Sequence, residues 1–288
     1  MKIINGKELA KTIKTSIKDK ISQITGREPC LAVVIVGNNP ASKIYVKNKE
    51  KACVDCGFKS LKYELEESVS EDNLLTLIDK LNNDVNVDGI LIQLPLPNHI
   101  NEEKVLLAID PNKDVDCFHP FNVGKLYTSK KNSDNCVLPC TANGCLKLIK
   151  TVCEDLSGKN AVVIGRSNIV GKPVAQLLLN ENCTTTITHS RTKNIENITK
   201  NTDILVVAIG KAKFLKSSMI KDDAIVIDVG INRLEDGTVC GDVDFEEIQK
   251  QDRNISITPV PGGVGPMTIA CLMENTFNFY MNSIKNKK

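Results

Sequence analysis

The stretch AVVIGRSNIVGKP, residues 161–173, decides the fold of this chain. Its apolar start, AVVI, is typical of a buried strand, and Pro173 suits the first turn of a following helix because its missing amide costs nothing there. Between the two, Gly165 ends the strand, Ser167 stands in the place of a middle glycine, and Gly171 precedes the helix. The free amides and helix dipole of such a strand-turn-helix unit predict a diphosphate site.

Strand and helix patterns alternate downstream of this stretch. Residues 184–188, 204–209 and 224–229 are further strand candidates, and helical segments separate the first three strands of this half. Strands that alternate with helices predict a parallel sheet. We therefore expect a Rossmann-type, doubly wound nucleotide-binding domain.

The upstream half shows the same alternation. Apolar residues at three- and four-residue spacing predict an opening amphipathic helix; they are Leu9, Ile13, Ile17, Ile21 and Ile24. Strands are expected at residues 31–36, 61–65 and 89–94, and helices over residues 42–56, capped by Ser42, and around residues 74–81. The fold class is thus α/β, with two α/β domains around a cleft.

A polar stretch, residues 129–135, separates the two halves, and Thr141 is the expected cap of the next helix. We expect a first domain over residues 1–138, which a C-terminal helix over residues 267–288 completes. The second domain then covers residues 139–266.

Composition excludes several classes of function. The 288 residues carry a net charge of only +2, so the protein has no overall electrostatic field that would attract nucleic acid or a membrane surface. The longest apolar runs are strand length, and the amino terminus has no apolar signal core. We expect a cytoplasmic protein that acts on a small molecule.

The eleven cysteines are expected to be reduced, because their number is odd and no secretion signal is present. Cys53 and Cys56 form a CxxC, and Cys136, Cys140 and Cys145 lie close together. No second pair or histidine stands at zinc-ligand spacing, so no metal site is predicted.

The residues after the strand at 184–188 bear on the choice of cofactor. An Asp or Glu usually ends this strand and binds the ribose hydroxyls of NAD, but here His189, Ser190 and Arg191 follow it. Together with Arg166, these donors suit a 2′-phosphate and favour NADP over NAD. The alternative is that both arginines are solvated surface charges. Gly210 would let backbone approach the cofactor closely.

Tyr45 and Lys49 lie four residues apart on a predicted helix and share one face. A lysine can act as an acid or base in a partly dry site, although such a pair is commonly ordinary amphipathic surface. Gln93 favours the catalytic interpretation, because it falls near the carboxyl end of a strand, where α/β proteins bind ligands.

Two loops carry further candidates. Asp114 and Asp116 could hold a substrate that has several N–H donors, or they could close their own loop by bonding its backbone. The loop PVPGGVGPMT, residues 259–268, combines rigid prolines with glycines that bring backbone close to a flat ligand. Its alternative interpretation is a tight turn before a helix.

Seven motifs occur in order: ASKIYVKNKEKAC (41–53), GILIQLPLP (89–97), PNKDVDCFHPFNVGKL (111–126), GRSNIVGKP (165–173), DVGIN (228–232), GDVDF (241–245) and TPVPGGVGPMTIACLMENT (258–276). With them the chain resembles the bifunctional methylenetetrahydrofolate dehydrogenase/cyclohydrolase family nearly end to end. The resemblance implies a homodimer built through the nucleotide-binding domains. It also implies the NADP-dependent oxidation of 5,10-methylenetetrahydrofolate to 5,10-methenyltetrahydrofolate and the hydrolysis of the product to 10-formyltetrahydrofolate, in one-carbon metabolism and purine biosynthesis.

The same resemblance implies roles for single residues. Lys49 resembles the general acid/base of the hydrolysis, with Gln93 bonded to it, and Tyr45 would stack on or orient the folate. Asp116, with Asp114 nearby, would anchor the pterin. Further implied contacts are with folate for Pro261, Gly262 and Gly263, and with NADP for Gly165, Arg166, Ser167, Ile169, Ser190, Ile231 and Thr268, of which Ile231 and Thr268 would lie nearest the nicotinamide.

One departure from the family pattern is Cys117, which stands where glycine is usual and is expected to make the protein sensitive to alkylation. Three other functions stay open. They are a monofunctional dehydrogenase, a two-domain enzyme similar to shikimate dehydrogenase, and a cofactor-sensing binding protein without turnover. The presence of Tyr45, Lys49 and Gln93 together favours the bifunctional enzyme.

Overall fold

The structure is a computed structural model that describes residues 1–129, 137–251 and 253–285. Contacts between Cα atoms divide it into two compact units. Unit 1 holds the described residues within 1–10, 126–129 and 141–268, and unit 2 holds those within 11–125, 137–140 and 269–285. In the described parts of the chain, no helix is long and apolar enough to cross a membrane.

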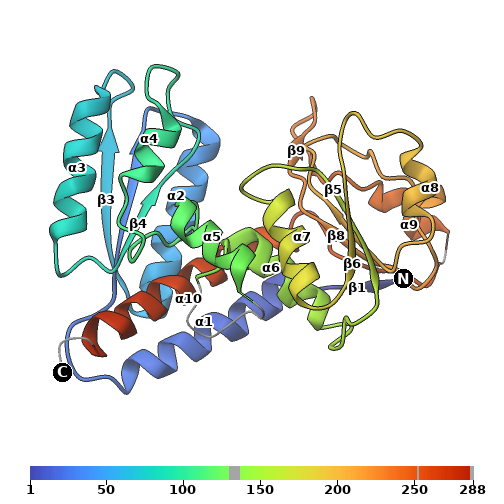
Figure 1. Cartoon of the computed structure of the whole chain (residues 1–288), viewed down its shortest axis with the longest axis horizontal. Coiled ribbons are helices and arrows are strands. Elements are labelled where there is room, and N and C mark those ends of the chain that lie inside the picture. The colour runs from blue at the N-terminus through green and yellow to red at the C-terminus, as the bar shows by residue number, and fades with distance from the viewer. Residues whose placement is uncertain (130–136, 252, 286–288) are drawn as a thin grey trace. The chain divides into compact units, whose positions relative to one another are not determined.

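Unit 1 is built on a six-stranded, wholly parallel sheet of order β1-β11-β8-β7-β5-β6. Figure 1 labels four of these strands, β1, β5, β6 and β8. Its strands are β1 (Lys2–Ile3), β5 (Asn160–Ile164), β6 (Thr184–Thr188), β7 (Ile204–Val207), β8 (Ile225–Asp228) and β11 (Ser256–Ile257). The central strands β7 and β8 are buried along their whole length, as a parallel sheet covered on both faces requires.

The connections of unit 1 create a topological switch point between β5 and β7. From β5 the chain moves outward to β6 and then returns to place β7 on the other side of β5. The helical segments are α6 (Cys140–Lys150), α7 (Gly171–Asn180), α8 (Ile195–Thr199), α9 (Phe245–Lys250) and the 3₁₀ turn η1 (Ser217–Met219); a short hairpin joins β9 (Asn232–Arg233) to β10 (Val239–Cys240). Ligands of doubly wound sheets bind outside the carboxyl ends of the strands at such a point.

Unit 2 contains a three-stranded parallel sheet of order β3-β2-β4, with the buried strand β2 at its centre. The strands are β2 (Cys30–Val36), β3 (Lys59–Leu65) and β4 (Gly89–Ile92), and the helices are α2 (Pro40–Cys56), α3 (Glu71–Asn83), α4 (Glu102–Leu107) and α5 (Pro120–Thr128). Two further helices are α1 (Gly6–Ser22) and α10 (Val264–Lys285); like α5 and α6, each of them has residues in both units.

Several expected element boundaries are wrong. Asn39, not Ser42, caps α2, because its side chain accepts the amides of Ala41 and Ser42 and Pro40 opens the helix. Thr141 lies inside α6 instead of capping it. The strand expected to reach residue 94 ends at Ile92, so Gln93 directly follows β4.

The strand β1 was not predicted, because two residues carry no readable periodicity. It pairs with β11, more than 250 positions away, so residues 1–10 group with unit 1. The domain boundary at residues 138/139 stays a prediction. The polar stretch at residues 129–135 lies almost wholly outside the described residues. Residues 286–288, the end of the C-terminal helix expected over residues 267–288, also lie outside them.

Candidate functional site

Lys49 and Gln93 form a hydrogen-bonded pair in unit 2. The Nζ of Lys49 donates to Oε1 of Gln93 at 3.0 Å, and the side chain of Gln93 in turn donates through Nε2 to the carbonyl of Leu94 at 2.7 Å. The whole Lys49 residue is only 8% exposed, which is unusual for lysine. Helix α2 supplies the lysine and the carboxyl end of β4 supplies the glutamine, so the expected contact between them is present.

Asp116 adds a carboxyl group to this pair. Burial, with the charge of nearby Asp114, raises the pKa of Asp116, while the ammonium of Lys49 and a hydrogen bond with the Cys140 thiol act against that rise. The carboxyl group of Asp116 therefore lies within the electrostatic reach of Lys49. The ammonium of Lys49, the amide of Gln93 and the carboxyl group of Asp116 together form a partly desolvated site that can bind and transfer a proton.

Tyr45 lies one helical turn before Lys49 on α2, and it is half-buried. Desolvation raises the pKa of its phenol, so the ring stays neutral at physiological pH. A neutral, half-buried ring one turn from the Lys49 ammonium offers an apolar face to a flat ligand.

Asp114 has a different role from Asp116. Its carboxylate accepts the amides of Phe118 and His119 at 3.1 and 2.9 Å and the side-chain amide of Asn122 at 2.9 Å. Asp114 is itself buried. Of the two roles left open for this residue, these bonds support the closing of its own loop.

Cys117 follows in the same loop with φ of +59°, in the left-handed region that glycine adopts without cost. Its thiol is fully buried and donates to the carbonyl of Val137 at 3.2 Å. The expected sensitivity to alkylation is not supported at this position, because a reagent cannot reach a buried thiol. No disulfide joins any of the ten described cysteines, and Cys136 lies outside the described residues.

The loop after β5 has the expected strand-turn-helix form. Gly165 has φ of +125°, and a Cβ there would overlap the carbonyl oxygen of Ala208, so only glycine fits. The expectation of free amides needs correction, because the hydroxyl of Ser167 accepts the amides of Val170 and Gly171 at 3.2 Å. Ser167 thus binds two of the amide groups that we expected to be free for a phosphate.

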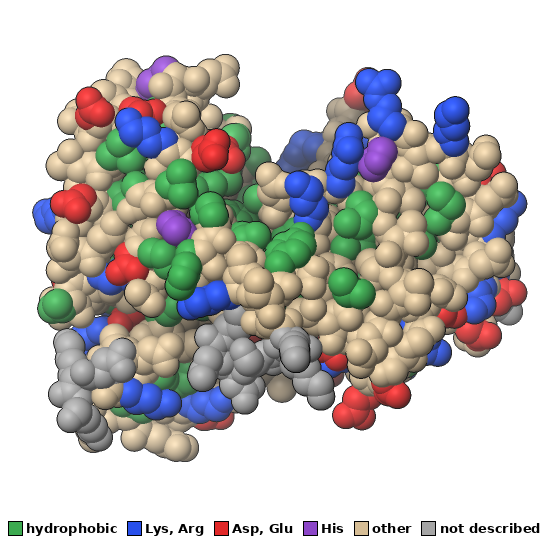
Figure 2. Space-filling model, in the orientation of Figure 1, with side chains coloured by type: hydrophobic (Ala, Val, Ile, Leu, Met, Phe, Trp, Pro, Cys, Tyr) green, Lys and Arg blue, Asp and Glu red, His purple; other side chains and the backbone are tan. Residues whose placement is uncertain are grey.

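Five of the seven candidate cofactor contacts are exposed on unit 1, whereas Gly165 is buried and Thr268 is half-buried. Arg166, Ser167 and Ile169 are exposed on the loop after β5. Ser190 and Arg191 are exposed in a turn that the amide of Thr192 closes on the carbonyl of His189 at 2.8 Å. Figure 2 shows Lys and Arg side chains on the visible face of this unit.

A pocket of about 150 Å³ in unit 1 brings together two motifs that lie about 30 residues apart. Ile231, which is 53% exposed, lines it with Pro261, Gly262 and Gly263. Nearby in sequence, the hydroxyl of Thr268 pairs with that of Thr141 at 3.2 Å. An apolar wall of this kind suits a flat ring.

Two buried aspartates of unit 1, Asp228 and Asp242, were not among the predicted site residues. Their only signal in the sequence was an adjacent or nearby glycine in DVGIN and GDVDF. Glycine is needed there because a Cβ at Gly230 would overlap the carboxylate of Asp242, and one at Gly241 would overlap that of Asp228.

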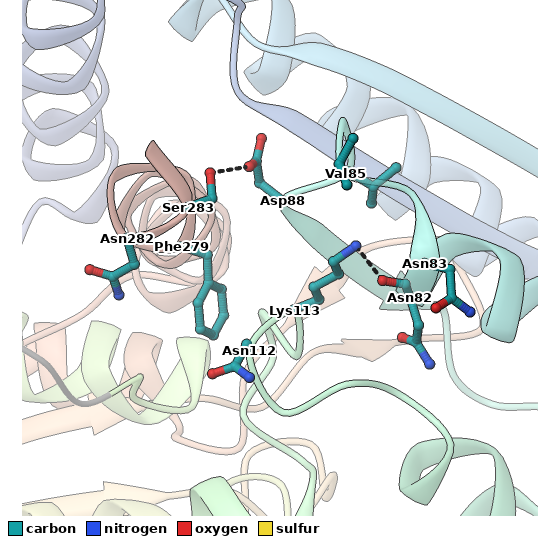
Figure 3. Close-up of a pocket in the computed structure, with 10 residues that line it drawn as sticks. Asn82, Asn83, Val85, Asp88, Asn112, Lys113, Phe279, Asn282 and Ser283 are labelled. Atoms are coloured by element: carbon teal, nitrogen blue, oxygen red, sulfur yellow. Dashed lines mark hydrogen bonds between the residues drawn. The ribbon is translucent and has the colours of Figure 1, made fainter. Parts of the chain in front are cut away.

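A larger cavity, of about 380 Å³, lies in unit 2 and includes Asp88, Lys113 and Ser283 (Figure 3). Its charged groups already have partners. The ammonium of Lys113 donates to three carbonyls at the end of α3, and Asp88 accepts from Arg27, the amide of Cys30 and Ser283. Asp88 also precedes β4, whereas Gln93 follows it, so this cavity is not the site of Lys49. Among the described residues, no group of three His, Cys, Asp or Glu could hold a metal ion.

These features define a class of protein. One unit is a doubly wound sheet with a glycine loop at its switch point, and the other holds a buried lysine that is hydrogen-bonded to a glutamine and lies near a carboxyl group. The combination is typical of a two-domain α/β enzyme that binds a nucleotide cofactor.

The family follows from the comparisons with known proteins. Residues 4–116 match the model of the tetrahydrofolate dehydrogenase/cyclohydrolase catalytic domain, and residues 139–284 match the NAD(P)-binding domain of the same family. The chain belongs to the tetrahydrofolate dehydrogenase/cyclohydrolase family.

Individual relatives agree over their full length. The bifunctional protein FolD of Acetivibrio thermocellus is 56% identical over 277 residues, which cover 96% of this chain and 95% of the relative. The crystal structure of the bifunctional FolD enzyme of Campylobacter jejuni has a TM-score of 0.93 at 50% identity, with both chains fully covered. The Trypanosoma brucei enzyme, solved in complex with NADP and an inhibitor, has a TM-score of 0.92 at 36% identity over 98% of each chain.

Proposed function

We propose that this chain is a bifunctional enzyme of one-carbon metabolism. It oxidises 5,10-methylenetetrahydrofolate to the methenyl form with NADP, and it hydrolyses that product to 10-formyltetrahydrofolate. The single observation that carries the proposal is the buried Lys49, hydrogen-bonded to Gln93, in a chain of the tetrahydrofolate dehydrogenase/cyclohydrolase family. Hydrolysis of the methenyl cation requires proton transfer, which a lysine held in this way can provide.

The oxidation needs positioning more than acid/base help. The methylene carbon lies between two nitrogens, whose lone pairs stabilise the cation that remains when a hydride leaves for the nicotinamide. Unit 1 supplies the cofactor contacts in this proposal, from Gly165, Arg166, Ser167, Ile169, Ser190, Ile231 and Thr268. Ile231 and Thr268 face the nicotinamide end.

The hydrolysis needs proton transfer, because water attacks the methenyl cation and must lose a proton. Lys49 serves as the general acid/base, and Gln93 holds its Nζ in place. Tyr45 stacks on or orients the folate, and Asp116 accepts N–H groups of the pterin. Asp114 acts on that contact only by closing the loop. Pro261, Gly262 and Gly263, which line the pocket of unit 1, contact the folate in this proposal.

NADP is preferred over NAD in this proposal. After β6 the chain offers Ser190 and Arg191 in an exposed turn, with Arg166 exposed after β5, and none of the three would repel a 2′-phosphate. Guanidinium groups recognise phosphate by charge and by paired N–H donors.

We further propose a cytoplasmic homodimer built through the nucleotide-binding domain, with the domain boundary at residues 138/139. Support for the dimer comes from β6, which is an edge strand with Ile187 41% exposed, and from Leu179 on α7, 53% exposed. Exposed apolar side chains and the unpaired backbone of an edge strand are commonly covered by a partner. Sedimentation equilibrium of the wild type and of Ile187→Lys tests it, because a charge at that edge should yield monomers.

The deciding experiment compares the wild type with Lys49→Met, and with Lys47→Met as a control on the exposed side of the same helix. Methenyltetrahydrofolate is followed at its absorbance band, with methylenetetrahydrofolate and either NADP or NAD. We expect Lys49→Met to oxidise the methylene substrate and to lose the hydrolysis, while Lys47→Met keeps both steps. A wild type that binds NADP without turnover would replace this proposal with the cofactor-sensing protein.

A further inference from the structure

Asp242 binds a run of backbone amides at the switch point of unit 1. One oxygen of its carboxylate, Oδ2, accepts the amides of Ile209 and Gly210 at 2.7 and 3.0 Å. The other, Oδ1, accepts the amide of Lys211 at 2.8 Å and Nδ2 of Asn232 at 2.9 Å. Asp242 is fully buried, so these four N–H groups replace water around its charge.

The segments that Asp242 joins are both placed to meet a cofactor. Residues 209–211 follow β7, which lies next to β5 and its glycine loop. Asn232 begins β9 directly after Ile231, the exposed apolar residue of the pocket in unit 1. The carboxylate of Asp242 therefore holds two separate segments in position, residues 209–211 and Asn232.

A second buried aspartate, Asp228, binds the backbone around Asp242. Its carboxylate accepts the amides of Gly230 and Asp242 through Oδ1 at 3.0 and 2.9 Å, and that of Val243 through Oδ2 at 2.9 Å. Its own amide donates to the hydroxyl of Thr258 at 2.8 Å. Asp228 thus holds the backbone that carries Asp242, and it also lines the pocket beside Ile231.

We propose that Asp242 is a positioning residue for the dehydrogenase step, which holds the loops carrying Gly210 and Ile231 against the cofactor. That the step is a dehydrogenation rests on the proposed function. The positioning role of Asp242 rests on its hydrogen bonds. The hydrogen-bond donors that Asp242 accepts from, at Ile209, Gly210, Lys211 and Asn232, all belong to unit 1, whereas Lys49 and Gln93 belong to unit 2. The loss of Asp242 should therefore separate the two activities.

The test variant is Asp242→Asn, which puts an NH₂ group where one oxygen faces two N–H donors. We expect its Kd and KM for NADP to rise about tenfold, with hydrolysis of added methenyltetrahydrofolate within about twofold of the wild type. The matched control is Asp244→Asn, two residues later, whose carboxylate only caps α9 and pairs with Lys216. It should leave both steps unchanged.

A purely structural role would lower the thermal midpoint without moving the Kd for NADP of the folded fraction, which calorimetry measures directly. If Asp242→Asn does not fold, Asn232→Ala removes only one of the four donors and should still raise the Kd for NADP about threefold. Unchanged NADP binding in the folded variant overturns the inference. A wild type that binds NADP but does not reduce it overturns the proposed function, and the binding comparison then still decides the role of Asp242.

Discussion

Lys49 keeps its ammonium almost out of solvent, with Gln93 as its hydrogen-bond acceptor in the described structure. Gln93→Leu keeps the approximate volume and removes the acceptor. We expect the cyclohydrolase rate to fall about 10²-fold, because a general acid/base that has lost its orientation transfers protons poorly. Oxidation of the methylene substrate should change much less.

The measurement for Gln93→Leu is the pH profile of both steps. A shift of the cyclohydrolase profile shows that Gln93 acts through Lys49, and Gln23→Leu, at an exposed position of unit 2, is the control. Equal losses in both activities would contradict the assignment, since they indicate general damage to the fold.

Asp228 makes stability depend on pH. Burial raises its pKa to about 7, although the amides of Val243, Asp242 and Gly230 oppose the rise. Between about pH 4 and pH 7 the folded protein then holds a proton that the unfolded chain has released. Stability should therefore decrease as pH rises through this window, by up to about 1.4 kcal/mol per pH unit.

Asp228→Asn removes this titration, so the dependence of the free energy of unfolding on pH should flatten between about pH 4 and pH 7. Denaturant titrations at several pH values measure it. Asp236→Asn changes an exposed carboxylate whose pKa is lowered by the amide of Thr238, so its slope in this window should match the wild type. A slope that survives in Asp228→Asn would assign the proton to another group.

At the scale of elements, the segment from β5 through its loop to α7 requires glycine at position 165. Gly165→Ala combines an unfavourable φ of +125° with an overlap on the backbone of Ala208, which cannot move away cheaply. We expect a loss of about 3 kcal/mol of stability and weaker NADP binding. Chemical denaturation and calorimetry measure the two effects.

Gly158→Ala is the matched control for that variant. Gly158 also has a positive φ, +74°, but a Cβ there meets nothing within 4 Å. It should cost about 1 kcal/mol and leave NADP binding unchanged. Equal losses of stability in Gly165→Ala and Gly158→Ala would mean that the positive φ alone, without the overlap, explains the requirement for glycine at position 165.

For the whole molecule, cofactor binding should stabilise unit 1 selectively. Ligand at about 100 times its Kd adds about 2.7 kcal/mol to the state that binds it. Hydrogen exchange with NADP should slow most in residues 165–171, 189–192, 209–211 and 229–232, and least around Lys49. Equal protection in both units would argue against a cofactor site confined to unit 1.

Much of the architecture could be read from local patterns. Alternating strands and helices, the glycine loop after β5 and the Tyr45, Lys49 and Gln93 candidates all depend on spacing within one element or on the end of one strand. Such signals are visible in sequence because they arise between neighbouring residues. Element ends were less predictable, as Asn39 in place of Ser42 shows, since two polar residues near a helix start compete as caps.

Other features depended on contacts between residues far apart in the chain. The pairing of β1 with β11, the role of Asp114 in closing its loop, and the carboxylates of Asp228 and Asp242 on backbone amides have no periodic signature. A buried carboxylate is stable only where the folded backbone brings N–H groups to it from several segments. The sequence alone therefore identified the family and its chemistry, whereas the tertiary structure decided which aspartates hold the loops.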